Sequence, residues 1–178
     1  MGKIIVPPPV KLISGLISSN LDLMERAKEL LQREYGALEL ASPLFPFDVT
    51  KYYEREMGPG LLRQYICFHP LIGRERLPEI KLLTNDLESS FTNPSGGREI
   101  NIDPGYLTLE NLILATTKKA SHRPYLRDGI YAELTYRFIK GSFRELEWTY
   151  PDYRQPQSIE FFNQAREGYR QQLAGDKQ

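Results

Sequence analysis

Two long segments with helical spacing of apolar residues constrain the fold of this chain most. They are residues 22–35, which precede Gly36, and residues 74–91. An apolar stripe at helical spacing indicates one buried face, and glycine is typical just after the end of a helix. The β-α-β-β-α-β order that results predicts a ferredoxin-like core, in which two helices cover one face of a four-stranded sheet. The four core strands are expected in short apolar runs at residues 11–18, 37–42, 61–69 and 98–102.

The second half of the chain is expected to extend this sheet. Asp103-Pro104-Gly105 has the composition of a turn, and residues 109–118 are interpreted as the next strand. Residues 130–139 alternate between apolar and polar side chains, and residues 143–148 return as a hairpin partner. A last helix is expected at residues 158–173. The predicted fold class is therefore α+β, with an extended antiparallel sheet, an added hairpin and a C-terminal helix.

The length of 178 residues fits one domain. Residues 10–173 are expected to form it, between a flexible proline-rich tail at 1–9 and a flexible tail at 174–178. No run of about 20 apolar residues suggests a membrane span, and the N-terminus lacks the pattern of a signal peptide. We therefore expect a cytoplasmic protein. Whether it forms a homo-oligomer is left open.

Composition argues against several partners. Lys plus Arg and Asp plus Glu number 23 each, which provides no long-range field for nucleic acid or a membrane surface. The single cysteine, Cys67, cannot form an internal disulfide or a thiolate metal cage. The chain also has no phosphate-binding P-loop motif, no dinucleotide-binding glycine motif, no nucleophile elbow and no H-E-x-x-H zinc motif. No cofactor and no metal are assigned.

The most unusual chemistry lies between Arg98 and Glu133. Cationic and imidazole side chains concentrate between Lys118 and Arg127. If the strand ending at Lys118 pairs antiparallel with residues 130–139, Thr116 to Lys118 lie near Tyr131 to Glu133. The loop between these strands then brings His122 and Arg123 to the same end. We interpret this region as a pocket for a small anionic ligand, such as a phosphate or a nucleotide.

Each candidate residue has an expected role. Lys118, His122 and Arg123 would hold the anion, because ammonium and guanidinium groups bind phosphate and carboxylate oxygens. The hydroxyls of Thr116 and Thr117 would donate hydrogen bonds. His122 would act as an acid or base with Glu133 or Asp103, because imidazole titrates near neutral pH. The remaining candidates, which could stack on the ligand or donate to it, are Tyr106 and Tyr131.

Other interpretations compete with this one. The same residues could be strand ends and a solvated loop with local salt bridges. A metal site from Asp103, His122 and Glu133 lacks tight ligand spacing. A different class of function is a non-catalytic interaction module that presents the aromatic stretch from Phe45 to Tyr53 to a protein partner. The sequence leaves open whether the protein is an enzyme.

Six motifs together resemble a known family. In chain order they are S-P-L-F-P-F-D at 42–48, Y-Y-E-R-E-M-G at 52–58, N-I-D-P-G-Y-L-T at 101–108, L-A-T-T-K-K at 114–119, H-R-P-Y-L at 122–126 and G-I-Y-A-E at 129–133. The set resembles the prokaryotic domain-of-unknown-function family numbered 4416, over roughly residues 10–173. The resemblance implies a single-domain bacterial or archaeal protein, and some members are labelled GTP-binding. It implies no role for any single residue.

Overall fold

The computed structural model describes residues 2–175, so Met1 and residues 176–178 of the two predicted tails lie outside the described residues. Residues 2–9 contain no helix or strand, and residues 174–175 belong to the last helix. The elements are β1 (Val10–Ser18), α1 (Leu21–Tyr35), β2 (Leu38–Ala41), β3 (Phe45–Pro46), α2 (Glu54–Met57), β4 (Leu62–Ile72), a 3-10 turn (Arg74–Arg76), α3 (Leu77–Ser90), β5 (Asn101–Leu107), β6 (Asn111–Thr116), β7 (Tyr125–Arg127), β8 (Ile130–Ile139), β9 (Ser142–Glu145) and α4 (Pro156–Gly175).

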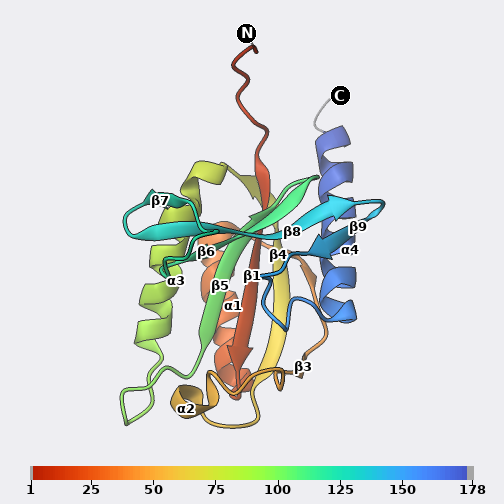
Figure 1. Ribbon diagram of the computed structural model, residues 1–178. Coiled ribbons are helices and arrows are strands. Elements are labelled where there is room, and N and C mark those ends of the chain that lie inside the picture. The colour runs from red at the N-terminus through yellow and green to blue at the C-terminus, as the bar shows by residue number, and fades with distance from the viewer. Residues whose placement is uncertain (1, 176–178) are drawn as a thin grey trace.

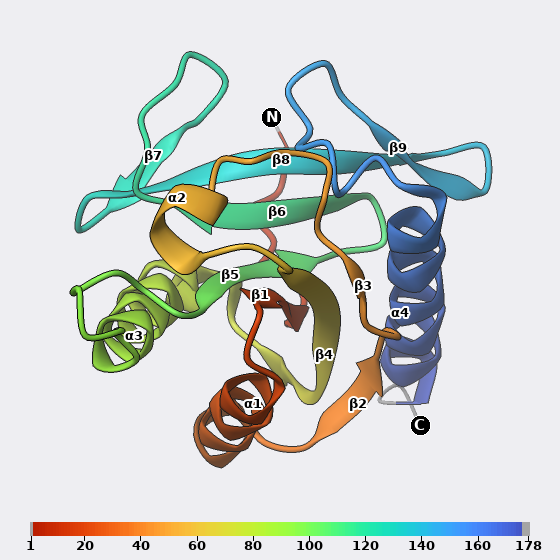
Figure 2. The ribbon, with the colours of Figure 1, turned by 90° about the horizontal axis from the view of Figure 1, so that it is seen from below.

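The strands form one antiparallel sheet (Figure 1). Its order is β2-β4-β1-β5-β6-β8-β7, with β3 paired to β4 and β9 paired to β8. Helices α1 and α3 pack on one face, and α4 stands on the other face beside β9 (Figure 2). The predicted α+β class, with a large antiparallel sheet and a C-terminal helix, is confirmed.

Strand β1 is the centre of the molecule, because all nine of its residues are buried. Leu12 and Leu16 point into the core beneath α1 and α3. Ile13 points to the opposite side, into the core that packs against α4. A strand that is covered on both faces needs apolar side chains at successive positions, which explains the nearly continuous apolar run at this site.

The predicted turn at Asp103-Pro104-Gly105 is wrong. These residues lie inside β5, opposite Gly15, Ser14 and Ile13 of β1. Proline in a strand normally removes a ladder hydrogen bond. On the side away from β1, however, β6 pairs with β5 only from Gly105 to Leu107. The missing N–H of Pro104 therefore costs no bond to β6, and the strand expected at residues 98–102 instead runs from Asn101 to Leu107.

Gly15 leaves room for the guanidinium of Arg63 to lie against the face of β1. A methyl group added at this position would lie 2.7 Å from Nη1 of Arg63 and 2.9 Å from the hydroxyl oxygen of Tyr153. Both neighbours are buried, so neither can swing into solvent. The absence of a side chain at Gly15 thus creates the space for the guanidinium of Arg63.

We predict that Gly15→Ala lowers the free energy of unfolding by about 1–3 kcal/mol, because overpacking a tight interior forces neighbouring side chains away from their preferred positions. Urea denaturation followed by circular dichroism measures the change. Gly2→Ala is the control, because nothing lies within 4 Å of the added methyl group. Unfolding curves that coincide for the wild type and Gly15→Ala would contradict this account.

Candidate functional site

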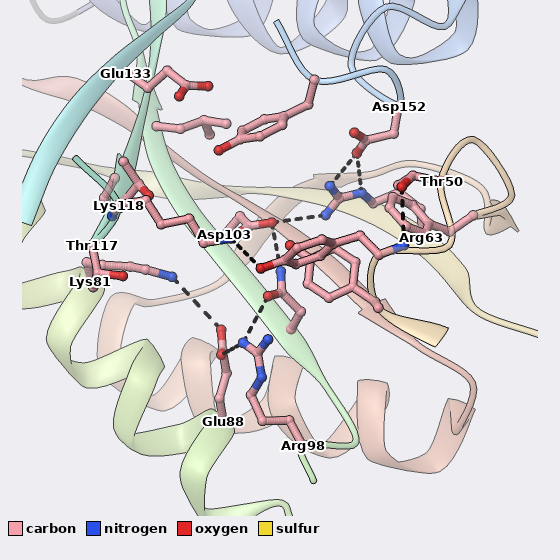
Figure 3. Close-up of a pocket in the computed structure, with 18 of the residues that line it drawn as sticks. Thr50, Arg63, Lys81, Glu88, Arg98, Asp103, Thr117, Lys118, Glu133 and Asp152 are labelled. Atoms are coloured by element: carbon pink, nitrogen blue, oxygen red, sulfur yellow. Dashed lines mark hydrogen bonds and ion pairs between the residues drawn. The ribbon is translucent and has the colours of Figure 1, made fainter. Parts of the chain in front are cut away.

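A cavity of about 480 Å³ opens where β5 and β6 diverge (Figure 3). Its walls come from β4, β5, α3, the ends of β6 and β8, the segment between β3 and α2, and the segment before α4. Four cationic side chains and four carboxylates line it together with aromatic rings. The size is that of a site for a small molecule.

Side chains of α3 replace the missing strand beside Ile102. The N–H of Ile102 donates to Oε1 of Glu88 at 2.7 Å, and Nζ of Lys81 donates to the Ile102 carbonyl at 3.1 Å. A buried backbone group needs a partner, and here α3 supplies it where β6 does not pair. The space that another strand would fill therefore stays open.

Arg98 links the chain segments that form one wall of the cavity. Its Nε and Nη2 donate to the two carboxylate oxygens of Glu56, at 2.8 and 2.9 Å, and its Nη1 donates to Glu88 and to Asn101. The hydrogen bonds that Arg98 donates to Glu56 raise the pKa of Arg98, whereas burial raises the pKa of Glu88. This network ties α2 to α3 and to the start of β5.

The buried guanidinium of Arg63 lines another wall of the cavity. The side chain of Arg63 is 3% exposed, and its Nε and Nη2 both donate to Asp152. Its Nη1 lies 3.6 Å from Oδ2 of Asp103 and has no hydrogen-bond partner among the described residues. Burial opposes the charge of Arg63, but Asp152 and the other groups around the guanidinium together outweigh burial and raise its pKa. Two carboxylates thus share one cation.

The structure brings His122, Arg123 and Glu133 together. Nε of Arg123 donates to Oε2 of Glu133 at 2.5 Å, and Nε2 of His122 lies 3.5 Å from the same oxygen. The His122 ring stacks on Trp148, and Nη2 of Arg123 donates to the Tyr150 hydroxyl. The Glu133 side chain is 1% exposed, yet its Oε1 has no partner among the described residues.

Lys118 lies at the cavity with Thr116 and Thr117. Its Nζ donates to the hydroxyl of Tyr52 at 2.9 Å and sits 4.5 Å from the centre of that ring. Among the described residues, no carboxylate comes within 4 Å of this ammonium group. The hydrogen bond from Lys118 lowers the pKa of Tyr52.

The other sequence candidates divide into two groups. Asp103 lines the cavity, because β5 continues through the residues expected to turn. Tyr106 and Tyr131 do not line it. Tyr106 packs on the core beneath α3, and Tyr131 meets the ring of Tyr125 at 5.3 Å.

Sequence reasoning missed Arg63, Asp152 and Glu88. The signal available for Arg63 was a cation in an otherwise apolar strand. Asp152 and Glu88 carry no such signal, because their surroundings come from distant segments.

Residues 2–175 contain neither a metal-ligand cluster nor a membrane-spanning helix. No three His, Cys, Asp or Glu side chains in this range are close enough together to hold a metal ion. None of the helices in the same range is both long and apolar enough to span a bilayer.

We predict that Tyr52 ionises at a lower pH than an ordinary tyrosine, and that Lys118→Met raises its pKa by removing the donor and the positive charge. Ultraviolet titration of the phenolate, as a difference between each protein and its Tyr52→Phe counterpart, measures this pKa. Lys119→Met is the control for loss of a nearby charge. An unchanged Tyr52 titration in Lys118→Met would show that the contact does not persist in solution.

A family model described as "Domain of unknown function (DUF4416)" matches residues 8–169. No curated protein and no solved structure matches the chain. Because the match covers nearly the whole chain, the protein belongs to the DUF4416 family.

Proposed function

We propose that the cavity binds a small molecule with an anionic, phosphate- or nucleotide-like group, and that Lys118 holds this group. The observation that carries the proposal is the environment of Lys118. This ammonium group lines the cavity, and no carboxylate of the described residues lies within 4 Å of it. An anion at this position would supply the missing counter-charge.

The other cations are already engaged. Arg63 bonds Asp152, Arg98 bonds Glu56 and Glu88, and Arg123 bonds Glu133. Lys81 lies 3.9 Å from Glu88. An anion would have to compete with a carboxylate at each of these groups, so Lys118 offers the least opposed contact. The role expected for Arg123 accordingly shifts from holding the ligand to orienting Glu133.

Proton transfer is a second step that this site could support. Oε1 of Glu133, at the cavity, has no hydrogen-bond partner among the described residues, and Nε2 of His122 lies 3.5 Å from the other oxygen, Oε2. A general base must lie within hydrogen-bonding reach of the proton that it removes. In an enzyme, Glu133 would be the general base, and His122 would influence how readily Glu133 takes up a proton. Asp103 would be the second candidate for the general base.

An interaction module is the alternative function, and the aromatic stretch from Phe45 to Tyr53 gives it less support. Phe47 is buried, and Phe45 and Tyr53 are partly buried. Tyr52 is exposed but is held by Lys118. Phe47, Tyr52 and Tyr53 line the cavity and Phe45 packs against the core, so this stretch forms little open docking surface.

We also propose that the first half of the chain is a ferredoxin-like core. The order β2-β4-β1-β5, with α1 and α3 on one face, supports this assignment. The cavity would then lie at the seam between that core and the added strands.

We predict that anionic ligands stabilise the wild type against heat, and that Lys118→Met weakens their binding by about tenfold or more, the usual effect of losing a hydrogen bond to a charged group. A thermal-shift screen with inorganic phosphate, nucleotides and sugar phosphates identifies the ligand, and calorimetry measures its affinity. Lys119→Met should bind as the wild type does. Equal stabilisation of the wild type and Lys118→Met would place the binding site elsewhere, and no stabilisation by any of these compounds would contradict the proposal.

A further inference from the structure

One wall of the cavity carries more negative than positive charge. We call it the acidic wall and define it by the carboxylates of Asp103, Glu133 and Asp152. Two guanidiniums compensate them: Arg63 serves Asp103 and Asp152, and Arg123 serves Glu133. Three carboxylates thus face two guanidiniums, and the imidazole of His122, 3.5 Å from Oε2 of Glu133, adds a positive charge only when it is protonated.

Glu133 is the most deeply buried carboxylate of this wall. Its carboxylate points into the cavity (Figure 3), and its side chain is only 1% exposed. Oε2 receives Arg123, whereas Oε1 receives no hydrogen bond within the described part of the chain. A buried carboxylate oxygen without a donor is costly, so a donor from outside the chain would be strongly favoured here.

The excess charge defines the chemistry of that donor. A neutral hydroxyl could satisfy Oε1 of Glu133 but would leave the third carboxylate uncompensated. A protonated amine provides three donors, no acceptor and one positive charge. Asp103 is a further carboxylate of this wall, and its side chain is 26% exposed and accepts one hydrogen bond, from Asn101. The Tyr150 ring also lines this wall, and the face of an aromatic ring attracts cations.

We propose that the ligand of this cavity is amphoteric, with a protonated amine against Glu133 and Asp103 and an anionic group at Lys118. This inference rests on the proposed function and specifies its substrate class. The ligand is an amino-phosphate or amino-carboxylate rather than a simple phosphate ester. The chain's own charges support it, since the acidic wall has more carboxylates than guanidiniums and no carboxylate of the described residues lies within 4 Å of Lys118.

Two matched pairs of probes test the amine. They are O-phosphoethanolamine with ethyl phosphate, and glucosamine 6-phosphate with glucose 6-phosphate. Isothermal titration calorimetry on the full chain gives the dissociation constant of each. Within at least one pair, the amine should bind about tenfold more tightly or better, because hydrogen bonds to charged groups contribute at this level.

Two variants locate the effect. Glu133→Gln should abolish the preference for the amine within each pair. Asp103→Asn should reduce the same preference, and it changes a residue that is partly exposed. Glu160→Gln is the matched control, because this exposed carboxylate lies on α4 away from the cavity. It should retain the preference of the wild type.

The outcomes separate this inference from the function on which it rests. If the two members of each pair bind equally well and Lys118→Met lowers the affinity for all four probes, the proposed anion site is supported. The inference that the ligand carries an amine is then overturned. If none of the four probes binds, the amine is overturned, and the thermal-shift screen with phosphate and nucleotides decides the proposed function separately. If Glu133→Gln does not fold, as judged by circular dichroism, Asp103→Asn decides, and an undiminished preference in that variant overturns the inference.

Discussion

The two hydrogen bonds that α3 makes to the backbone of Ile102 are the constraint on which the cavity depends. Sheet strands normally satisfy one another's backbone groups, and a strand that loses its neighbour inside a protein must find other partners. Here Glu88 accepts from the N–H and Lys81 donates to the carbonyl. Pro104, two residues later, has no N–H to satisfy. β5 can therefore separate from β6 without an unpaired donor at either residue, and the gap becomes a polar cavity.

The cavity walls are held by buried and half-buried ion pairs between distant segments. Arg63 of β4 reaches Asp152 before α4, and Arg98 joins α2 to α3 through its two carboxylate partners. Breaking such a pair on one side leaves a buried charge without compensation, which is strongly destabilising. These pairs fix the positions of the walls and leave Lys118 and Oε1 of Glu133 as the open contacts. The same group of charged side chains thus holds the cavity walls in place and determines which ligand we propose for the cavity.

The predictions from sequence succeeded where the physics is local. The apolar periodicity of α1 and α3 predicted both helices, and the alternation in β8 predicted that strand. Lys118 and Glu133 were both named as candidates because antiparallel pairing of β6 and β8 places their ends together. The turn at Pro104 was wrong because its composition is that of a turn, while the side chains that support β5 belong to α3.

The sequence by itself determined the α+β class, the central buried strand and the region from Arg98 to Glu133 in which to look for chemistry. Periodicity and strand pairing are properties of neighbouring residues, so they can be recognised in one dimension. Only the tertiary structure decided which charges remain open. Whether a cation is free depends on carboxylates far away in the chain, as Arg63 and Asp152 demonstrate across 89 positions. For that reason the proposed anion contact is Lys118, whereas Arg123 pairs with Glu133.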